Sequence, residues 1–259
     1  MSLTIKKTNK MSKIELDKDQ LIGMTETSDP AFNLDIFDRL YNGNIIITKH
    51  LTNKVIEKLI ENKDKCIVHC DCTGMGGTKI EPFVPSVEQT YGKFQQLIEN
   101  GFPIEQVVLR IDTVVPTDKG INTVKHVLET FKNSGIKRVR FSILDMYNHV
   151  KERFNNAGFP LPYETFHAPY EMRKKVYDMF KEYGEKYGFD VEVCAEPGFE
   201  SVPCLSQKDI DILGLTDKIT LIGSAEQRKH CSCPQNKRQL CSYSVENKCK
   251  HGCLYCYMK

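Results

Sequence analysis

The sequence predicts an α/β protein, a complete or partial TIM-like (β/α) barrel followed by a cysteine-rich C-terminal tail. Three observations support this prediction. The 259 residues are 40% hydrophobic, which is enough for one sizeable core. Short β-branched runs alternate with segments of helical period along most of the chain. Six of the eleven cysteines follow His230, so the thiols are concentrated at one end.

Six β-branched runs are predicted strands, and a weaker run is a seventh. They are LIGMT (21–25), NIIIT (44–48), CIVHC (66–70), VVLRI (107–111), VRFSIL (139–144), VEVCA (191–195) and, more weakly, ITLIG (219–223). Repeated βα units build a parallel sheet, and six or seven of them indicate a barrel. A doubly wound open sheet is the alternative.

Local signals mark where several helices begin and end. Asp29 and Pro30 predict a helix start as cap and first-turn proline, and Ser86 with Gln89 forms a capping box for another helix. Gly101 and Gly135 stand where helices are expected to end.

The chain divides into three predicted segments. Residues 1–18 form a polar leader that we expect to be disordered, residues 19–225 form the barrel, and residues 226–259 form an iron–sulfur tail packed on it. The leader lacks an apolar signal segment and no run approaches the roughly 18 apolar residues of a membrane span. We therefore expect a cytoplasmic protein without membrane contact, in a bacterium or, if viral, in its host cell.

The net charge of +2 excludes a strongly basic polyanion binder, although the tail has seven Lys or Arg against two Glu.

Polar residues fall at the predicted strand ends, where the chemistry of barrels is located. Arg110 and Asp112 are two apart and so share one face of their strand, as do Glu192, Cys194 and Glu196. The others are Thr25 to Asp29, Thr48-Lys49-His50, Asp71 to Gly74, and Asp145. Satisfied salt bridges are the plainer interpretation of any one pair. The glycine-rich stretch 74–77 matches no phosphate-binding motif, which favours an ordinary turn over a phosphate cradle.

Three cysteines in CKHGCLYC, Cys249, Cys253 and Cys256, are spaced to converge on one metal centre. Thiolates select zinc or iron–sulfur centres, which normally take four protein ligands. A cluster held by three cysteines leaves one iron open. The alternative is a structural zinc site completed by Cys241 or His251. Disulfides are disfavoured because the chain is long and lacks a signal peptide.

The remaining cysteines form two groups. Cys66, Cys70 and Cys72 are predicted to pack in the core or lumen. A second cluster or a zinc ion could be held by Cys194, Cys204, Cys231, Cys233 and Cys241, which would pin the tail to the barrel. The alternative for Cys194 is a buried core thiol.

The pattern Cys249-x3-Cys253-x-Tyr255-Cys256 resembles the cluster motif of the radical S-adenosylmethionine superfamily. The resemblance implies a 4Fe-4S cluster, S-adenosylmethionine cleaved to a 5′-deoxyadenosyl radical, and an external electron donor of the flavodoxin or ferredoxin type. In that superfamily the motif usually follows the first strand, where this chain has TETSDPAF. We therefore expect a circularly permuted barrel or a motif relocated to a folded-back tail.

Residues 20–259 also resemble the family catalogued as domain of unknown function 1848. The segments that carry the resemblance are TSDPAF (27–32), TKH (48–50), TGMG (73–76), IEPFVPS (80–86), RIDTVVPTDKG (110–120), CAE (194–196), CSC (231–233) and CKHGCLYCY (249–257). Two departures affect the substrate: Glu26-Thr27 replaces an arginine pair, and Thr113 replaces the proline after Asp112. The fourth-strand pattern is distantly similar to spore photoproduct lyase, which acts on thymine in DNA.

These resemblances predict an isomerase or lyase that acts on a modified nucleobase, for example hypermodified thymine in viral DNA. Four residues are candidates for catalysis and five for cofactor binding: Lys49, Arg110, Asp112 and Glu196, and Thr48, Thr73, Gly74, Ser142 and Tyr255. The expected partners are S-adenosylmethionine and a DNA or nucleotide substrate. A radical rearrangement of a small metabolite and a non-catalytic, zinc-stapled nucleic-acid-binding protein are the alternatives.

Overall fold

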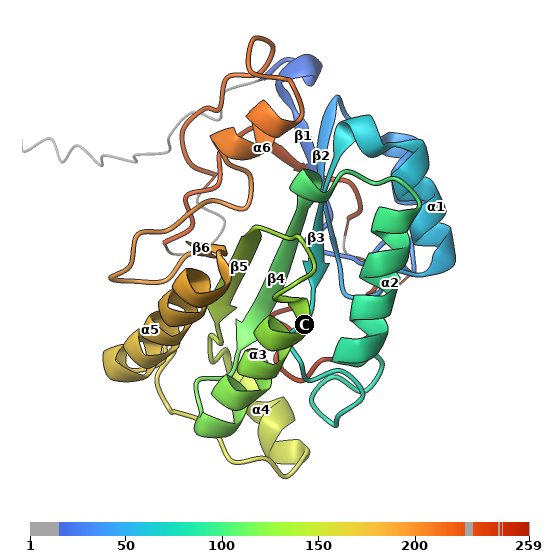
Figure 1. Cartoon of the computed structure of the whole chain (residues 1–259). Coiled ribbons are helices and arrows are strands. Elements are labelled where there is room, and N and C mark those ends of the chain that lie inside the picture. Colours follow the sequence, from blue (N-terminus) through green and yellow to red (C-terminus); the bar gives the residue numbers. More distant parts are fainter. Residues whose placement is uncertain (1–15, 226–229, 243, 245, 259) are drawn as a thin grey trace, which may run out of the picture.

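The computed structural model describes residues 16–225, 230–242, 244 and 246–258, which form an α/β fold (Figure 1). Seven strands are β1 (Ile22–Met24), β2 (Gly43–Thr48), β3 (Cys66–Asp71), β4 (Val107–Val114), β5 (Arg138–Ile143), β6 (Asp190–Val193) and β7 (Lys237–Gln239). The α-helices are α1 (Asn53–Glu61), α2 (Val87–Glu99), α3 (Asp118–Phe131), α4 (Asn148–Asn156), α5 (Tyr170–Tyr187) and α6 (Gln207–Ile212). Short 3-10 helices are η1 (Lys18–Gln20), η2 (Leu34–Arg39), η3 (Lys63–Lys65) and η4 (Ile104–Gln106).

The strands form one sheet in the order β6-β5-β4-β3-β2-β1-β7, and every neighbouring pair is parallel. The order proceeds in one direction, as in a barrel, whereas a doubly wound sheet reverses at a switch point. Within the described residues β6 and β7 are the two edges. The predicted α/β fold is confirmed, with the strand order of a barrel that is open between β6 and β7.

The seventh strand lies in a different place from the one predicted. Residues 219–223 have no strand structure, and the seventh strand is Lys237–Gln239. Two backbone amides in the predicted segment donate to side chains and not to a strand, Thr220 to Gln20 and Ile222 to Asn236. The ITLIG prediction was therefore wrong: a short β-branched run is insufficient without an edge to pair with.

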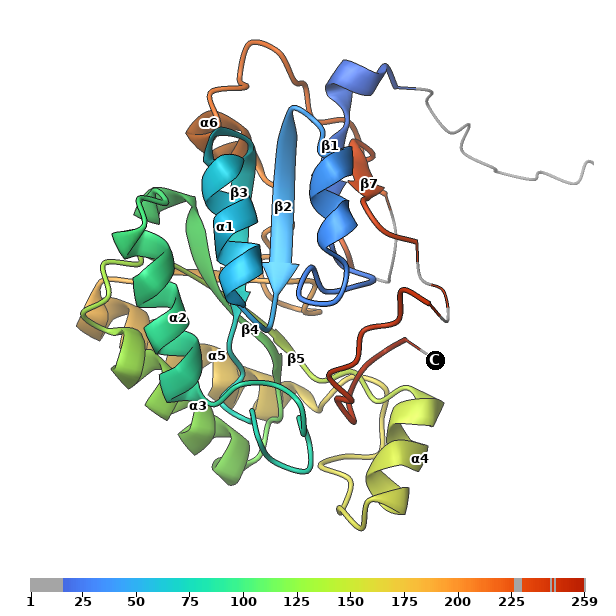
Figure 2. The same cartoon turned by 90° about the vertical axis from the view of Figure 1, so that its right-hand side faces the viewer.

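Strand β7 joins the sheet beside the first strand, although it is the last strand in the chain (Figure 2). Ile22 pairs with Lys237 and Met24 with Gln239, and the Leu240 amide donates to the Met24 carbonyl at 2.9 Å. The chain then continues along the carboxyl edge, where the Thr27 hydroxyl donates to the Cys241 carbonyl at 2.6 Å. This placement brings the three-cysteine motif to the carboxyl ends of β7, β1 and β2.

The two faces of the sheet bury different layers. Strand residues such as Ile46, Val68 and Leu109 pack in the larger cluster, together with apolar residues of α1, α2, α3 and α5. Figure 2 shows these helices in succession along that face. On the opposite face, Ile45 and Ile67 pack beneath a segment that contains Cys204, Leu205, Ile210 and Cys233. The alternation of side chains along each strand thus separates a helix-covered face from a face crossed by residues 194–225 and 230–233.

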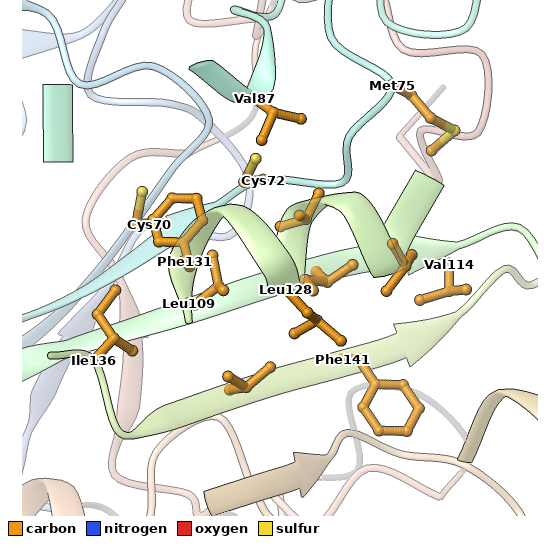
Figure 3. Packing of buried hydrophobic residues seen from close by; sticks show 14 of the residues in the cluster. Cys70, Cys72, Met75, Val87, Leu109, Val114, Leu128, Phe131, Ile136 and Phe141 are labelled. Atoms are coloured by element: carbon orange, nitrogen blue, oxygen red, sulfur yellow. The ribbon is translucent and has the colours of Figure 1, made fainter. Parts of the chain in front are cut away.

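The larger cluster is packed with aromatic and branched side chains (Figure 3). Phe131 of α3 lies near Cys70 and Leu109, and Phe141 of β5 stacks on Phe180 of α5 with ring centroids 3.9 Å apart. Cys66, Cys70 and Cys72 are all buried in this cluster. The prediction that these three cysteines pack in the core is confirmed.

Helix-end signals were correct for α2 and wrong for the first segment. Ser86 and Gln89 form the predicted capping box, and Gly101 follows the helix with a φ of +88°. Gly135 has a φ of +86° in the turn after α3. Asp29 caps no α-helix, however, because the helix nearby is η2, which begins after Asn33. The Asp29 carboxylate serves the site described below.

Residues 1–15, most of the predicted leader, lie outside the described residues, and η1 begins at Lys18, the last residue of that segment. Among the described helices, none has the length and apolar content that crossing a bilayer requires.

Candidate functional site

A cavity of about 290 Å³ opens at the carboxyl ends of the strands. Its lining includes residues of the loops after β1, β2, β4 and β5 and of the C-terminal tail. Figures 1 and 2 show the tail at the end of the sheet toward which the strand arrows point. The site-forming residues are Glu26, Asp29, Thr48, Lys49, Asp71, Arg110, Asp112, Ser142, Asp145, Cys194, Cys204, Cys231, Cys233, Cys249, His251, Cys253, Tyr255 and Cys256.

Asp29 and His251 join the cysteine loop to the first two strands. The His251 Nε2 atom lies 2.9 Å from Asp29 Oδ2, and its Nδ1 lies 3.1 Å from the Phe83 carbonyl oxygen. The Asp29 carboxylate also accepts from the Thr48 hydroxyl at 2.8 Å and from the Lys49 amide at 2.8 Å. Burial alone would raise the pKa of Asp29, but His251 and hydrogen bonds from the Ala31 and Lys49 amides lower it. The carboxylate therefore anchors the cysteine loop.

Lys49 is the cation at the centre of a buried acidic network. Its Nζ lies 2.7 Å from Asp71 Oδ2 and 3.3 Å from Glu81 Oε1, and it donates to the Asp112 carbonyl at 3.0 Å. Burial would lower the pKa of Lys49, but the two carboxylates hold it well above its usual value. Tyr255 donates to Glu81, and its ring centroid is 5.4 Å from Lys49 Nζ. The network ties the motif aromatic to the β2 and β3 ends.

Arg110 and Asp112 share one face of β4, as predicted, and form an ion pair. Asp112 also accepts from the Ser142 hydroxyl of β5. On its other side Arg110 Nη1 lies 3.4 Å from Cys204 Sγ and 3.4 Å from His69 Nδ1. Arg110 thus connects the strand-end carboxylate to a thiol.

Deeper on the same face is a second charged network. Arg138 Nε lies 3.0 Å from Glu192 Oε1 and its Nη1 lies 2.7 Å from Asp209 Oδ1, while Arg140 also binds Glu192. All four side chains are buried. These ion pairs join β5, β6 and α6 below the cavity.

The three motif cysteines all line the cavity. Burial raises the pKa of Cys249 to about 11 and that of Cys253 to about 12, and Cys249 interacts electrostatically with both Cys253 and Cys256. Backbone contacts hold the loop: the Leu254 amide donates to the Ile80 carbonyl at 3.0 Å, and Arg153 of α4 donates to the Cys256 carbonyl at 2.5 Å.

Four further cysteines, Cys194, Cys204, Cys231 and Cys233, line the same cavity. Cys194 Sγ lies 3.4 Å from Cys204 Sγ, and the Cys204 amide donates to Cys233 Sγ at 3.3 Å. Cys233 in turn contacts the Cys231 thiol. Cys241 is separate, buried in the larger core cluster. Of the five predicted members of a second centre, the structure therefore gathers four.

No group of three His, Cys, Asp or Glu side chains in the described part of the chain stands ready to hold a metal ion. The sulfurs surround the cavity without meeting at one point.

Several predicted site residues lie outside the cavity lining. The buried Glu196 side chain accepts from the Ile143 amide at 2.7 Å, and the Thr73 hydroxyl donates to Glu81 at 2.6 Å. Gly74 has a φ of +83°, and a Cβ there would meet Thr123 Cγ2 at 2.5 Å. The glycine-rich stretch packs against α3, as an ordinary turn would. The other candidates, Lys49, Arg110, Asp112, Thr48, Ser142 and Tyr255, line the cavity.

Sequence reasoning missed the role of three residues. Glu81 is fully buried and joins Lys49, Thr73 and Tyr255, yet it stands in a loop without a strand signal. Asp29 was interpreted as a helix cap and His251 as a possible zinc ligand. The histidine inside the CKHGC motif was the available signal for a partner at the strand ends.

The charged lining of the cavity is mainly acidic. Five carboxyl side chains, Glu26, Asp29, Asp71, Asp112 and Asp145, face two permanent cations, Lys49 and Arg110. Such a lining favours a ligand with positive charge.

Comparison with known proteins gives one family. A family model described as "Domain of unknown function (DUF1848)" matches residues 41–258. No curated protein matches the chain. A crystal structure of lysine/ornithine decarboxylase complexed with cadaverine from Vibrio vulnificus is 18% identical, with a TM-score of 0.33. The match covers 59% of this chain and 39% of the decarboxylase chain, and a likeness this weak carries no argument.

Proposed function

This chain belongs to the family described as "Domain of unknown function (DUF1848)", and from that premise we propose that it is a radical S-adenosylmethionine enzyme. One observation carries the proposal. Cys249, Cys253 and Cys256 follow a strand, β7, that pairs in parallel with β1, and they line the cavity at the carboxyl ends of the strands.

The strand order supports a permuted arrangement over a simple relocation. Starting from β7, the sheet is ordered β7-β1-β2-β3-β4-β5-β6, and the cysteine loop follows the first strand of that series. This is the position the motif has in the superfamily that it resembles. A permuted chain reaches it because β7 pairs with the edge that β1 leaves open.

The donor set fits an iron–sulfur cluster with one open iron. Three thiols share the lining, and the predicted fourth ligands of a zinc site are committed elsewhere: both His251 ring nitrogens have protein partners and Cys241 packs in the core. Soft thiolates are the ligands that such clusters use. When bound, the cluster with S-adenosylmethionine would supply a 5′-deoxyadenosyl radical that abstracts a hydrogen atom.

The chain's own residues would bind and orient the cofactor and the substrate. Lys49 and Arg110 keep their charge, because the pKa of each is held well above its usual value by carboxylates despite burial. Asp112 is positioned by Arg110 and Ser142, and its side chain is more exposed than those of Asp71 and Glu81, the acids that pair with Lys49. The acidic lining suits the sulfonium and amino groups of S-adenosylmethionine.

For the substrate we propose a compact, amine-bearing molecule, such as an amino-acid-bearing nucleobase derivative. The acidic lining and the cavity of about 290 Å³ support a small cation. The basic tail supports a DNA substrate less than its composition suggests, because two of its cations already have partners within the protein. Lys237 is buried 2.5 Å from Glu26, and Arg238 donates to the Gln235 carbonyl. A small-metabolite rearrangement is therefore the second candidate. A base in duplex DNA would have to be flipped to enter.

The test is anaerobic reconstitution of the full chain with iron and sulfide. Metal analysis, low-temperature EPR of the reduced protein and assay of 5′-deoxyadenosine with S-adenosylmethionine and dithionite follow. We expect cofactor cleavage in the wild type, near-complete loss in Cys253→Ala, and retention in Cys241→Ala, whose sulfur lies outside the cavity.

Cofactor cleavage that is absent under every reductant, with no EPR-active cluster, would reject the proposal. If cleavage occurs, its stimulation by free nucleoside, single-stranded DNA, duplex DNA and small amines identifies the substrate class. Salt-sensitive DNA binding without any cofactor cleavage would favour the non-catalytic alternative.

A further inference from the structure

Four cysteines of the cavity lining outside the CKHGC motif form a chain of sulfur contacts. Cys194 Sγ and Cys204 Sγ are 3.4 Å apart, Cys233 contacts Cys204, and Cys231 contacts Cys233. They come from three separate segments: the end of β6, the loop before α6, and the loop before β7. These segments meet on the sheet face that packs with Ile45 and Ile67. Chance burial of single thiols does not explain four in sequential contact.

Buried donors near this group lack acceptors. Arg140 Nη1 and His69 Nε2 have no hydrogen-bond partner in the described structure, although both side chains are fully buried. Both interact electrostatically with Cys204, and Arg140 also with Cys194. Arg110 Nη1 lies 3.4 Å from Cys204 Sγ. Unpaired buried donors are costly, and a group of thiolates would supply acceptors for them.

The backbone next to two of these cysteines is strained. Ala195 and His230, which adjoin Cys194 and Cys231, are the two non-glycine residues with positive φ in the described residues, at +52° and +67°. Such conformations cost roughly 1 to 3 kcal/mol and cluster at functional sites.

We propose that Cys194, Cys204, Cys231 and Cys233 bind a structural zinc ion, separate from the centre at Cys249, Cys253 and Cys256. Four sulfurs around zinc at about 2.3 Å lie about 3.8 Å from one another, close to the observed Cys194–Cys204 separation. A four-iron cluster would need wider spacing, because the whole cluster stands between its ligands. The thiols must rotate toward a common point, since they form a chain and not a closed tetrahedron.

Charge supports the same assignment. Zinc with four thiolates carries a net charge of about −2, and the guanidinium groups of Arg110 and Arg140 both face this group. The ion would join the segments around Cys194, Cys204 and Cys231 to one another and so fix part of the cavity lining. The inference does not depend on the proposed radical chemistry.

The test compares metal content among variants of the full chain, purified with a reductant and analysed for zinc and iron. We expect about one zinc per chain in the wild type, in Cys241→Ser and in the triple variant C249S/C253S/C256S. In Cys231→Ser and Cys204→Ser we expect zinc affinity to fall by at least the roughly 100-fold that loss of a supporting contact can cost. Cobalt substitution in the triple variant should give the intense visible spectrum of a tetrahedral tetrathiolate.

Each other outcome overturns the proposal. Failure of the wild type to contain or take up zinc, zinc retained at full affinity in both single variants, or iron in place of zinc in the triple variant would do so. Because Cys204 is buried and its substitution could unfold the protein, Cys231→Ser provides an alternative at a partly exposed position. Zinc-dependent protection of the four thiols from alkylation, mapped by mass spectrometry, decides the matter without any substitution.

Discussion

At the scale of single residues, the site depends on buried charges whose partners come from distant parts of the chain. Asp29 meets His251 across 222 positions, and Tyr255 meets Glu81 across 174. Such pairs are typical of functional sites, where burial and neighbouring charges shift pKa values. Two predictions belong to this scale.

The first concerns Asp71. Burial, with a contribution from Asp112, raises its pKa from 3.8 to about 6 despite Lys49. Between those values the folded protein keeps a proton that the unfolded chain has lost, so Asp71 lowers stability as the pH rises from about 4 to about 6. We expect the Asp71→Asn variant to lack this fall in stability between about pH 4 and about pH 6. Thermal unfolding of both proteins across this range measures it, and identical pH profiles would contradict the expectation.

The second concerns Gly252 between the motif cysteines. Its φ is +70°, and a Cβ there would lie 3.2 Å from Pro82 Cγ. Gly252→Ala should therefore cost about 1 to 2 kcal/mol and weaken iron binding after reconstitution. Gly92→Ala is the matched control, because that helical position has open space and should gain roughly 0.5 to 1 kcal/mol. Denaturant unfolding and iron analysis compare the two variants, and equal effects of Gly252→Ala and Gly92→Ala would contradict the prediction.

At the scale of elements, ion pairs between buried side chains join β5, β6 and α6. Glu192 of β6 binds Arg138 and Arg140 of β5, and Arg138 reaches Asp209 of α6. Removal of one member from such a buried network leaves an uncompensated charge.

We therefore expect Glu192→Ala to destabilise the protein by roughly 3 to 5 kcal/mol. Asp190 is the control on the same strand: it pairs with Lys208 at the surface, and Asp190→Ala should cost less than about 1 kcal/mol. Urea unfolding of the two variants distinguishes the two cases. A small effect of Glu192→Ala would mean that the buried network adds little to stability.

At the scale of the whole molecule, the three-residue strands β1 and β7 carry the candidate metal loop at one edge of the sheet, whereas the central strand β4 has eight residues and is buried except at Asp112. Regions with few paired residues open with lower free energy than the core. The site is thus positioned by the least extensive part of the sheet.

From this we expect hydrogen exchange to show strong protection in β3, β4 and β5 and weak protection in β7. Reconstitution with iron should raise the protection of β7 and the following loop, because a ligand stabilises the state it binds. Exchange followed by mass spectrometry, with the triple cysteine variant as control, measures both. Unchanged β7 protection in iron-loaded protein would show that metal binding does not stabilise this edge of the sheet.

The sequence by itself determined the repeated βα pattern, six of the seven strands, the α2 capping box and the three-cysteine motif. These depend on local periodicity and on spacing, which residues close in the chain specify. Only the tertiary structure decided that the seventh strand is Lys237–Gln239 and that Asp29 holds His251. It also decided that Cys194, Cys204, Cys231 and Cys233 come together while Cys241 stays in the core. Those facts depend on which strand edge remains open and on which distant side chains share one cavity, and local sequence specifies neither.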